Sequence, residues 1–107
     1  MSKYNAVISY VDGKKFHSLK EAHRYSELLL AVRGGVIKDL QTQVKYSLDV
    51  NDVHICNYIA DMVYQVVETN EMIVEDVKGY KKGSAYAMFS VKKKLMLACY
   101  GIEILET

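Results

Sequence analysis

Apolar residues recur at three- and four-residue steps in two segments of the chain. That period places apolar side chains on one face of a helix, so we predict two amphipathic helices. Ser18 can cap the start of the first helix and Gly34 or Gly35 can end it, while Gly101 can end the second. The predicted apolar stripes are Ala22, Tyr25, Leu29 and Val32 within residues 18–35, and Met88, Val91, Leu95 and Ala98 within residues 84–101.

Shorter apolar runs separated by turn residues predict strands around these helices. The run at 53–67 is apolar on both faces, so we expect it in the centre of a sheet. Consecutive strands joined by tight turns should pair antiparallel, whereas a strand reached through a helix can pair in parallel. The predicted strands are a hairpin at 6–16 turning at Asp12-Gly13, strands at 44–50, 53–67 and 72–80 joined by turns at Asn51-Asp52 and Thr69-Asn70-Glu71, and a last strand at 102–106. The predicted fold class is α/β (α+β), a mixed β-sheet flanked by helices, in the order hairpin-α-β-β-β-α-β.

Composition adds a few limits to this prediction. The length of 107 residues predicts one domain over residues 1–107. The net charge of +1 does not by itself indicate a nucleic-acid binder, so any basic surface must be local. Cys56 and Cys99 have no CxxC partner and no zinc spacing with a histidine, so we expect free buried thiols in a reducing compartment. No signal peptide and no segment of membrane-spanning length is visible, so we expect a cytoplasmic protein without a membrane partner.

Acidic residues within two of the predicted strands suggest a metal site. Asp61 lies between aliphatic neighbours, and strand alternation would put it on one face with Ile59 and Val63. Asp76 and Lys78 should share a face that is opposite to that of Glu75. If the strands form a hairpin, Asp61 and Asp76 lie close together and repel unless a positive charge separates them. Mg²⁺ commonly binds one or two carboxylates plus waters, and a nearby lysine can orient a metal-bound water or neutralise a phosphate.

This ordered set of residues resembles the PD-(D/E)xK nuclease superfamily. The matching positions are Glu21 in "SLKEAHRYSEL", Asp61 in "YIADMVY", and Asp76 and Lys78 in "VEDVKG". Nearly the whole chain is similar to a family of small phage and prophage proteins that is catalogued as a domain of unknown function. That family is placed among restriction-endonuclease-like folds, so the resemblance implies this fold for the sheet and helices predicted above.

The resemblance also implies roles for individual residues. Asp61 and Asp76 would bind Mg²⁺, or Mn²⁺ in its place, and the Val77 carbonyl would complete the metal site. Lys78 would act on the attacking water, and Glu21 would hold a metal directly or through water. The phage family tends to carry glutamine at the position of Gln43, and we assign Gln43 to nucleic-acid binding although its role stays open. The superfamily usually has glutamate where Asp76 stands, and a β-bulge could exchange Asp76 for Glu75 as the second ligand.

Each of these residues also has a structural alternative. Glu21 completes a capping box with Ser18, Asp61 could be a paired structural acid, and Asp76 could form an exposed ion pair with Lys78. Runs of lysine are usually solvated faces, but near a nuclease centre they would hold a DNA backbone without reading its sequence. The aromatic candidates, Tyr80 and Tyr86, could stack on a base but are better explained by packing. The lysines assigned to DNA binding are Lys81, Lys82, Lys92 and Lys93.

The sequence therefore predicts a Mg²⁺-dependent DNA endonuclease that hydrolyses phosphodiester bonds. A chain this short has no room for a separate sequence-reading domain, so we expect selection of junctions or branched DNA by shape, as in a Holliday junction resolvase. Symmetric cutting would suit a homodimer, and phage recombination or replication in a bacterial host's cytoplasm fits the resemblance. No small-molecule cofactor is expected. The alternatives are a non-catalytic nucleic-acid- or protein-binding module on the same fold, and a nuclease inhibitor or structural protein; the metal count and the choice among DNA substrates or RNA stay open.

Overall fold

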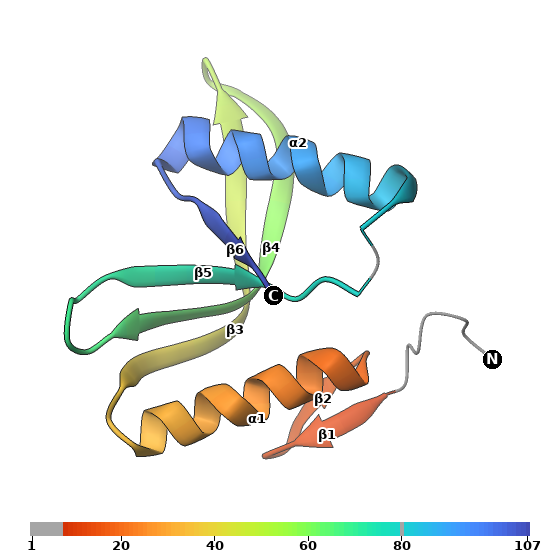
Figure 1. The fold of residues 1–107 in the computed structure, drawn as a ribbon. Helices are drawn as coiled ribbons and strands as arrows, with labels where there is room; N and C mark the ends of the chain where they lie inside the picture. Colours follow the sequence, from red (N-terminus) through yellow and green to blue (C-terminus); the bar gives the residue numbers. More distant parts are fainter. Residues whose placement is uncertain (1–7, 80) are drawn as a thin grey trace.

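The computed structural model describes residues 8–79 and 81–107 of the chain. The chain begins with a small β-hairpin and a helix, followed by two long strands (Figure 1). A shorter strand, a second helix and a short last strand complete the fold. The elements are β1 (Ser9–Val11), β2 (Lys14–Phe16), α1 (Leu19–Arg33), β3 (Ile37–Val50), β4 (Val53–Val66), β5 (Met72–Asp76), α2 (Gly83–Tyr100) and β6 (Ile104–Glu106).

The main sheet is mixed and has the strand order β3-β4-β5-β6, while β1 and β2 form a separate hairpin. β3, β4 and β5 pair antiparallel and β6 joins β5 in parallel, which confirms the predicted pairing. The predicted order of elements is also confirmed, although residues 6 and 7 of the predicted hairpin lie outside the described residues. We therefore describe the chain as an α+β protein with a four-stranded mixed sheet and two helices.

Two strand boundaries differ from the prediction. β3 begins at Ile37 rather than at residue 44, because a register shift and positive φ angles at Asp39 and Gln43 break the two-residue alternation there. β5 ends at Asp76 rather than at residue 80, and Tyr80 with its predicted packing lies outside the described residues. The structure thus places Asp76 at the end of its strand.

The helix ends follow the predicted caps. The Ser18 hydroxyl accepts a hydrogen bond from the backbone N–H of Glu21 at 3.1 Å, and Gly34 caps the other end of α1. α2 ends at Gly101, whose φ of 67° lies in the left-handed region that glycine adopts without strain. Both cysteines are free as predicted, but they are half-buried rather than buried.

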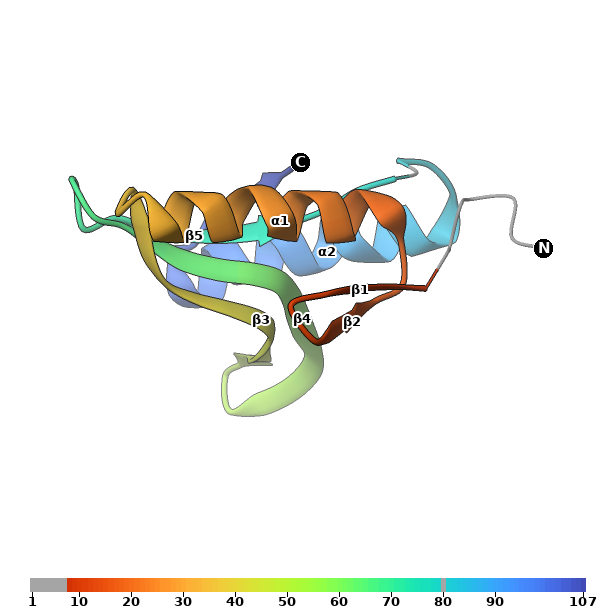
Figure 2. The same ribbon diagram turned by 90° about the horizontal axis from the view of Figure 1, so that it is seen from below.

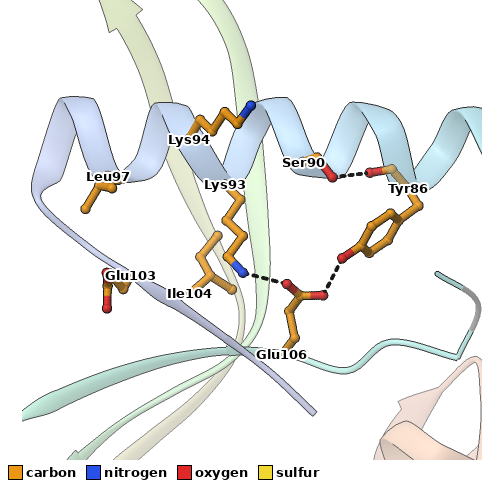
Figure 3. A pocket seen from close by; sticks show the side chains of 8 residues that line it. All are labelled: Tyr86, Ser90, Lys93, Lys94, Leu97, Glu103, Ile104 and Glu106. Carbon is orange, nitrogen blue, oxygen red and sulfur yellow. Dashed lines mark hydrogen bonds and ion pairs between the residues drawn. The ribbon is translucent and has the colours of Figure 1, made fainter. Parts of the chain in front are cut away.

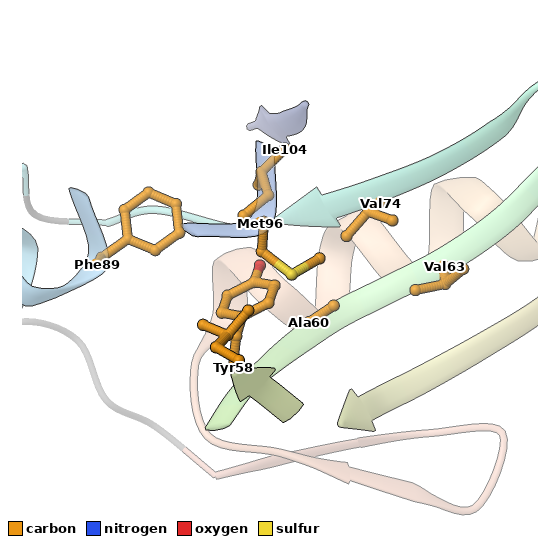
Figure 4. Close-up of a cluster of buried hydrophobic side chains, with 8 residues drawn as sticks. Tyr58, Ala60, Val63, Val74, Phe89, Met96 and Ile104 are labelled. Atoms are coloured by element: carbon orange, nitrogen blue, oxygen red, sulfur yellow. The ribbon is translucent and has the colours of Figure 1, made fainter. Parts of the chain in front are cut away.

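Two hydrophobic clusters lie on the two sides of the sheet. Val63 belongs to one cluster and its neighbours Met62 and Tyr64 to the other, so the clusters occupy opposite faces of β4. The α2 cluster, seen in Figure 4, contains Leu48, Tyr58, Ala60, Val63, Val74, Phe89, Met96 and Ile104. The α1 cluster contains Phe16, Ala22, Tyr25, Leu28, Ile37, Met62 and Tyr64.

The predicted stripe of α2 is wrong except at Leu95, which packs against the α2 cluster. Met88 and Val91 are 56% and 52% exposed, whereas Phe89 and Met96 are buried. The buried face also carries Lys93, whose charge breaks the apolar pattern and hides this face from a sequence reading. In α1, Ala22 and Tyr25 are buried as predicted, but Leu28 is buried in place of Leu29 and Val32, which are half-buried and exposed.

The alternation of side chains along β4 is interrupted at Asp61, so that the strand exchanges its two faces there; we call this the turn-over. Ala60 packs in the α2 cluster and Met62 in the α1 cluster, although a regular strand would place both on one face. Opposite Asp61 on β3 stands Gln43, which has a φ of 53°, and the strand register is the same on either side of this position. Figure 2 shows the hairpin of β3 and β4 bending along its length. Asp61 therefore lies where the hairpin passes from one helix to the other.

Because of this turn-over, the predicted faces of β4 are wrong, whereas those of β5 are confirmed. Ile59, Asp61 and Val63 do not share a face, because Ile59 is 50% exposed while Val63 is buried in the α2 cluster. The alternation predicted for β5 is confirmed: Val74 packs in the α2 cluster, and Ile73 packs against the α1 cluster.

Candidate active site

Asp61 and Asp76 lie opposite each other on neighbouring strands. Met62 pairs with Glu75 in the β4–β5 ladder, so the next position along brings Asp61 to Asp76 at the end of β5. Asp76 is only 4% exposed. The backbone N–H of Val77 donates a hydrogen bond to Asp61 Oδ2 at 2.8 Å, which holds the chain after β5 against this carboxylate. The two acids that the sequence predicted to meet are thus brought together.

The pKa values of both aspartates are raised by this arrangement. Burial, followed by the hydrogen-bond interaction with Asp61 and its charge, raises the pKa of Asp76 to about 7, although Lys78 acts in the opposite direction. Burial also raises the pKa of Asp61, and the interactions with Asp76 and the Val77 N–H oppose this rise. A buried carboxylate beside a half-buried one favours sharing a proton or binding a cation.

Glu21 approaches the pair from the first turn of α1. Burial raises the pKa of its carboxyl group, the interaction with the nearby Asp61 opposes this rise, and the charge of Asp76 adds to it. Its backbone N–H donates to the Ser18 hydroxyl, which is the Ser18 half of the predicted capping box. Glu21 therefore belongs to a row of three carboxyl groups that runs from α1 across β4 to β5.

Lys78 is held against the second acid. Its ammonium group forms an ion pair with Asp76 Oδ2 and lies 3.5 Å from the centroid of the Phe89 ring in α2. Its backbone is fixed as well, because its N–H donates to the Thr107 carbonyl at 2.9 Å and its carbonyl accepts from the Lys20 ammonium. The Lys78 side chain is 19% exposed, so the predicted alternative of a solvent-exposed ion pair is wrong.

Glu75 points to the other side of the sheet and has its own partners. It is fully buried, and Arg24 of α1 binds it in a bidentate ion pair, with Nε 2.7 Å from Oε2 and Nη2 2.9 Å from Oε1. Tyr64 and Thr107 donate to the same carboxylate at 2.8 Å and 3.2 Å. Burial alone would raise the pKa of Glu75, but the hydrogen bonds from Arg24 and Tyr64 lower it overall. In this arrangement Glu75 is not available as the alternative metal ligand.

The fit of the site to a metal ion can be judged from its donors. Among residues 8–79 and 81–107, no three or more His, Cys, Asp or Glu side chains converge tightly enough to hold a metal. Glu21, Asp61 and Asp76 therefore do not form a ready three-carboxylate metal site in the described part of the chain. The pair of Asp61 and Asp76 suits Mg²⁺, which usually keeps several waters and needs only one or two carboxylates. The carbonyl of Val77 stays a predicted ligand.

A pocket opens beside the second acid and the lysine. Its volume is about 290 Å³, and Asp76, Lys78 and Lys92 line it together with Asn57 and Tyr58. Lys92 extends from α2 to this pocket, so two lysines, Lys78 and Lys92, line it. The sequence singled out Lys92 only as part of a lysine run, and it gave no signal for Asn57 or Tyr58.

The other lysines assigned to DNA are not brought to this pocket. Lys93 lies on the other side of α2, where its ammonium binds Glu106 at 2.6 Å beside a second pocket of about 470 Å³ (Figure 3). Glu106 also accepts a hydrogen bond from Tyr86 at 2.8 Å and lies 4.0 Å from Lys81. Lys82 is exposed at the start of α2, and the exposed Gln43 stands opposite Asp61. Tyr86 is thus a packed, hydrogen-bonded residue.

These features define an α+β protein with a mixed four-stranded sheet and a pair of adjoining aspartates, one buried and one half-buried, beside a lysine at the end of β5. The chain belongs to the family described as protein of unknown function (DUF1064), whose sequence model matches residues 1–102. No curated protein and no solved structure matches the chain. Within the described residues, neither helix has the length and apolar character needed to cross a membrane.

Proposed function

We propose that this protein is a metal-dependent DNA endonuclease on a restriction-endonuclease-like fold. One observation carries the proposal: the half-buried Asp61 and the buried Asp76 lie opposite each other, with Lys78 bound to Asp76. The order acid, acid-x-lysine on adjoining strands is the order that the nuclease superfamily shows. The bulge that would have exchanged Asp76 for Glu75 is absent from the described pairing of β4 and β5.

The roles of the residues follow from their positions. Asp61, Asp76 and the Val77 carbonyl would hold Mg²⁺, or Mn²⁺ in its place, and the metal supplies an activated water and stabilises charge on the phosphate oxygens. Glu21 acts through its contact with Asp61. Lys78, with its ammonium between Asp76 and the pocket, orients the attacking water or neutralises the phosphate.

The substrate is proposed from size and surface. Lys92 in the pocket, together with Lys81, Lys82 and Gln43 at the surface, would contact the phosphate backbone and not the bases. Selection would then depend on DNA shape, which favours junctions and branched DNA over a base sequence. Symmetric cutting of such a substrate would suit a homodimer, and a phage-encoded protein would act in the cytoplasm of its bacterial host during recombination or replication.

Cleavage assays test this proposal. Labelled four-way junctions, flaps, nicked duplex, linear duplex and single strands are incubated with Mg²⁺, Mn²⁺ or chelator. We expect cutting of a branched substrate that chelator abolishes, and a loss of at least about a hundredfold in rate for Asp61→Asn and for Lys78→Ala, because these changes remove a metal ligand and the lysine at the water.

The matched control for the acid substitution is Asp52→Asn, since Asp52 lies in the exposed turn between β3 and β4. This variant should cut at the wild-type rate. Equal metal-dependent cutting by wild type, Asp61→Asn and Lys78→Ala would show that the nuclease centre lies elsewhere, and the absence of cutting from every substrate would refute the endonuclease assignment.

A non-catalytic binding module is the second candidate. The observation in its favour is that no three acidic, histidine or cysteine side chains in the described chain form a ready metal cage. Such a module would bind DNA with the same affinity in chelator and in Mg²⁺, and Asp61→Asn would leave this affinity unchanged. A nuclease inhibitor or structural protein would instead show no salt-dependent binding to DNA at all.

A further inference from the structure

The hydroxyl group of Tyr58 is buried without a hydrogen-bond partner. The Tyr58 side chain is 3% exposed, and its oxygen is the one buried side-chain polar atom in the described part of the chain that has no partner. A phenol packs well in a core when its hydroxyl is bonded, and leaving that group unpaired costs free energy that phenylalanine would not cost. An orphaned hydroxyl in a native structure therefore needs an explanation.

The position of the Tyr58 ring suggests an explanation for its unpaired hydroxyl. Tyr58 extends from β4 into the α2 cluster, with its ring centroid 6.4 Å from that of Tyr46 and 6.3 Å from that of Phe89 (Figure 4). It lines the same pocket as Asp76 and Lys78. Burial first, then the charges of Asp76 and Asp61, and also a side-chain interaction with Asp76, raise the pKa of Tyr58. The hydroxyl thus lies near Asp76, with which it shares the pocket, without the geometry of a hydrogen bond.

The ion-pair partner of Asp76 in the structure is Lys78, and the proposed reaction would draw Lys78 away from it. In the structure its Oδ2 is bound by the Lys78 ammonium, which also rests on the Phe89 ring. If a metal ion binds Asp76 and Lys78 turns to a water or a phosphate in the pocket, this carboxylate loses its lysine partner. Carboxylates that bind metals are commonly held in place by a hydrogen bond from a neighbouring side chain, and loss of that neighbour weakens metal binding.

We propose that Tyr58 is a positioning residue for Asp76: its hydroxyl donates a hydrogen bond to this carboxylate when Lys78 turns toward the pocket. The inference rests on the proposed function, because it takes Asp76 as a metal ligand. It explains why an unpaired hydroxyl stands beside the acids, where phenylalanine would fill the same space. Tyr58 itself need not touch the metal or the DNA.

The test compares Tyr58→Phe with Tyr46→Phe, since Tyr46 is the neighbouring tyrosine on β3 and packs against the same cluster. Binding of Mn²⁺ and Mg²⁺ to the metal-free protein is measured by isothermal titration calorimetry without DNA. Thermal unfolding is measured in chelator. We expect Tyr58→Phe to weaken metal binding about tenfold and Tyr46→Phe to leave it unchanged. In chelator Tyr58→Phe should unfold at the wild-type temperature or above it, because no resting hydrogen bond is lost.

The outcomes separate this inference from the proposed function. If the wild type binds metal and Asp61→Asn does not, but Tyr58→Phe binds as tightly as wild type, the positioning role is refuted and the metal site stands. A lower unfolding temperature for Tyr58→Phe in chelator would also refute it, because the hydroxyl would then have a resting partner. If the wild type binds no metal in a manner that Asp61→Asn removes, the proposed function fails together with the inference.

Discussion

Gln43 occupies a backbone conformation that is unusual for its residue type. Its φ of 53° lies in the left-handed region, in the middle of a strand and opposite Asp61. Non-glycine residues in this region are strained, and such strain is found most often at functional sites. Here the strained residue coincides with the point where the hairpin of β3 and β4 turns over, so the backbone of Gln43 helps to place the Asp61 carboxylate.

This strain predicts a stabilising substitution. Gln43→Gly should raise the free energy of unfolding by about 0.5–1 kcal/mol, because glycine adopts a positive φ without steric cost. Chemical denaturation in chelator measures the change. The control is Gln41→Gly: Gln41 is exposed on the same strand and has no positive φ, so glycine there should lower the free energy of unfolding by about 0.5–1 kcal/mol. The same loss of stability in both variants would contradict the assignment of strain to Gln43.

At the scale of elements, part of the site was readable from the sequence. The turn near Asn70 fixes the register of β4 on β5, and this register alone brings Asp61 to Asp76. Alternation along β5 separates Asp76 from Glu75, as predicted. The sequence did not show the turn-over at Asp61, because it arises from a backbone angle on the partner strand. Nor did it show that Arg24 would bind Glu75, because that contact depends on how α1 lies across the sheet.

Helix α2 divides its lysines between two environments, and no sequence period distinguishes them. Lys92 lines the pocket with Asp76 and Lys78, whereas Lys93 is paired with Glu106 on the other side. Lys93, which appears equivalent to Lys92 in the sequence, is therefore already paired with the acidic Glu106 of β6. That pairing also explains how a charged residue comes to lie on the packed face of the helix.

Binding measurements should separate these lysines. Lys92→Ala should weaken binding to branched DNA and lower the slope of log affinity against log salt by about 1, because one phosphate contact is lost. Lys93→Ala should leave this slope unchanged and cost about 0–1 kcal/mol of stability through the lost pair with Glu106. Fluorescence anisotropy over a salt series in chelator measures both slopes. A larger loss of slope in Lys93→Ala would contradict the proposed DNA path.

At the scale of the whole molecule, the acid pair should link stability to pH. Asp76 has a pKa of about 7 in the folded chain, above the ordinary carboxyl value of 3.8. The folded state therefore binds this proton more tightly than the unfolded state does, and stability conferred by the protonated form is lost as the pH rises through this range. Without metal, the free energy of unfolding should fall by about 3 kcal/mol between about pH 5 and pH 8.

Urea unfolding at a series of pH values, with chelator present, measures this dependence. Asp76→Asn should flatten the curve, because the amide cannot lose a proton and become charged. Curves of equal slope for wild type and Asp76→Asn would show that another group controls the pH response. Added Mg²⁺ should restore wild-type stability at the upper end of the range, since it binds the folded and deprotonated pair.

The parallel pairing of β6 with β5 has a consequence for synthesis. The segment after Asp76 is fixed by backbone hydrogen bonds to Thr107, which follows β6, and these strands are separated in the chain by the whole of α2. On a translating ribosome, β5 emerges well before the segment that anchors it. Incomplete chains therefore contain Asp61, Asp76 and Lys78 but lack the hydrogen bonds to Thr107 that fix the segment after β5. A nascent polypeptide can form this arrangement only after α2 and β6 have been made.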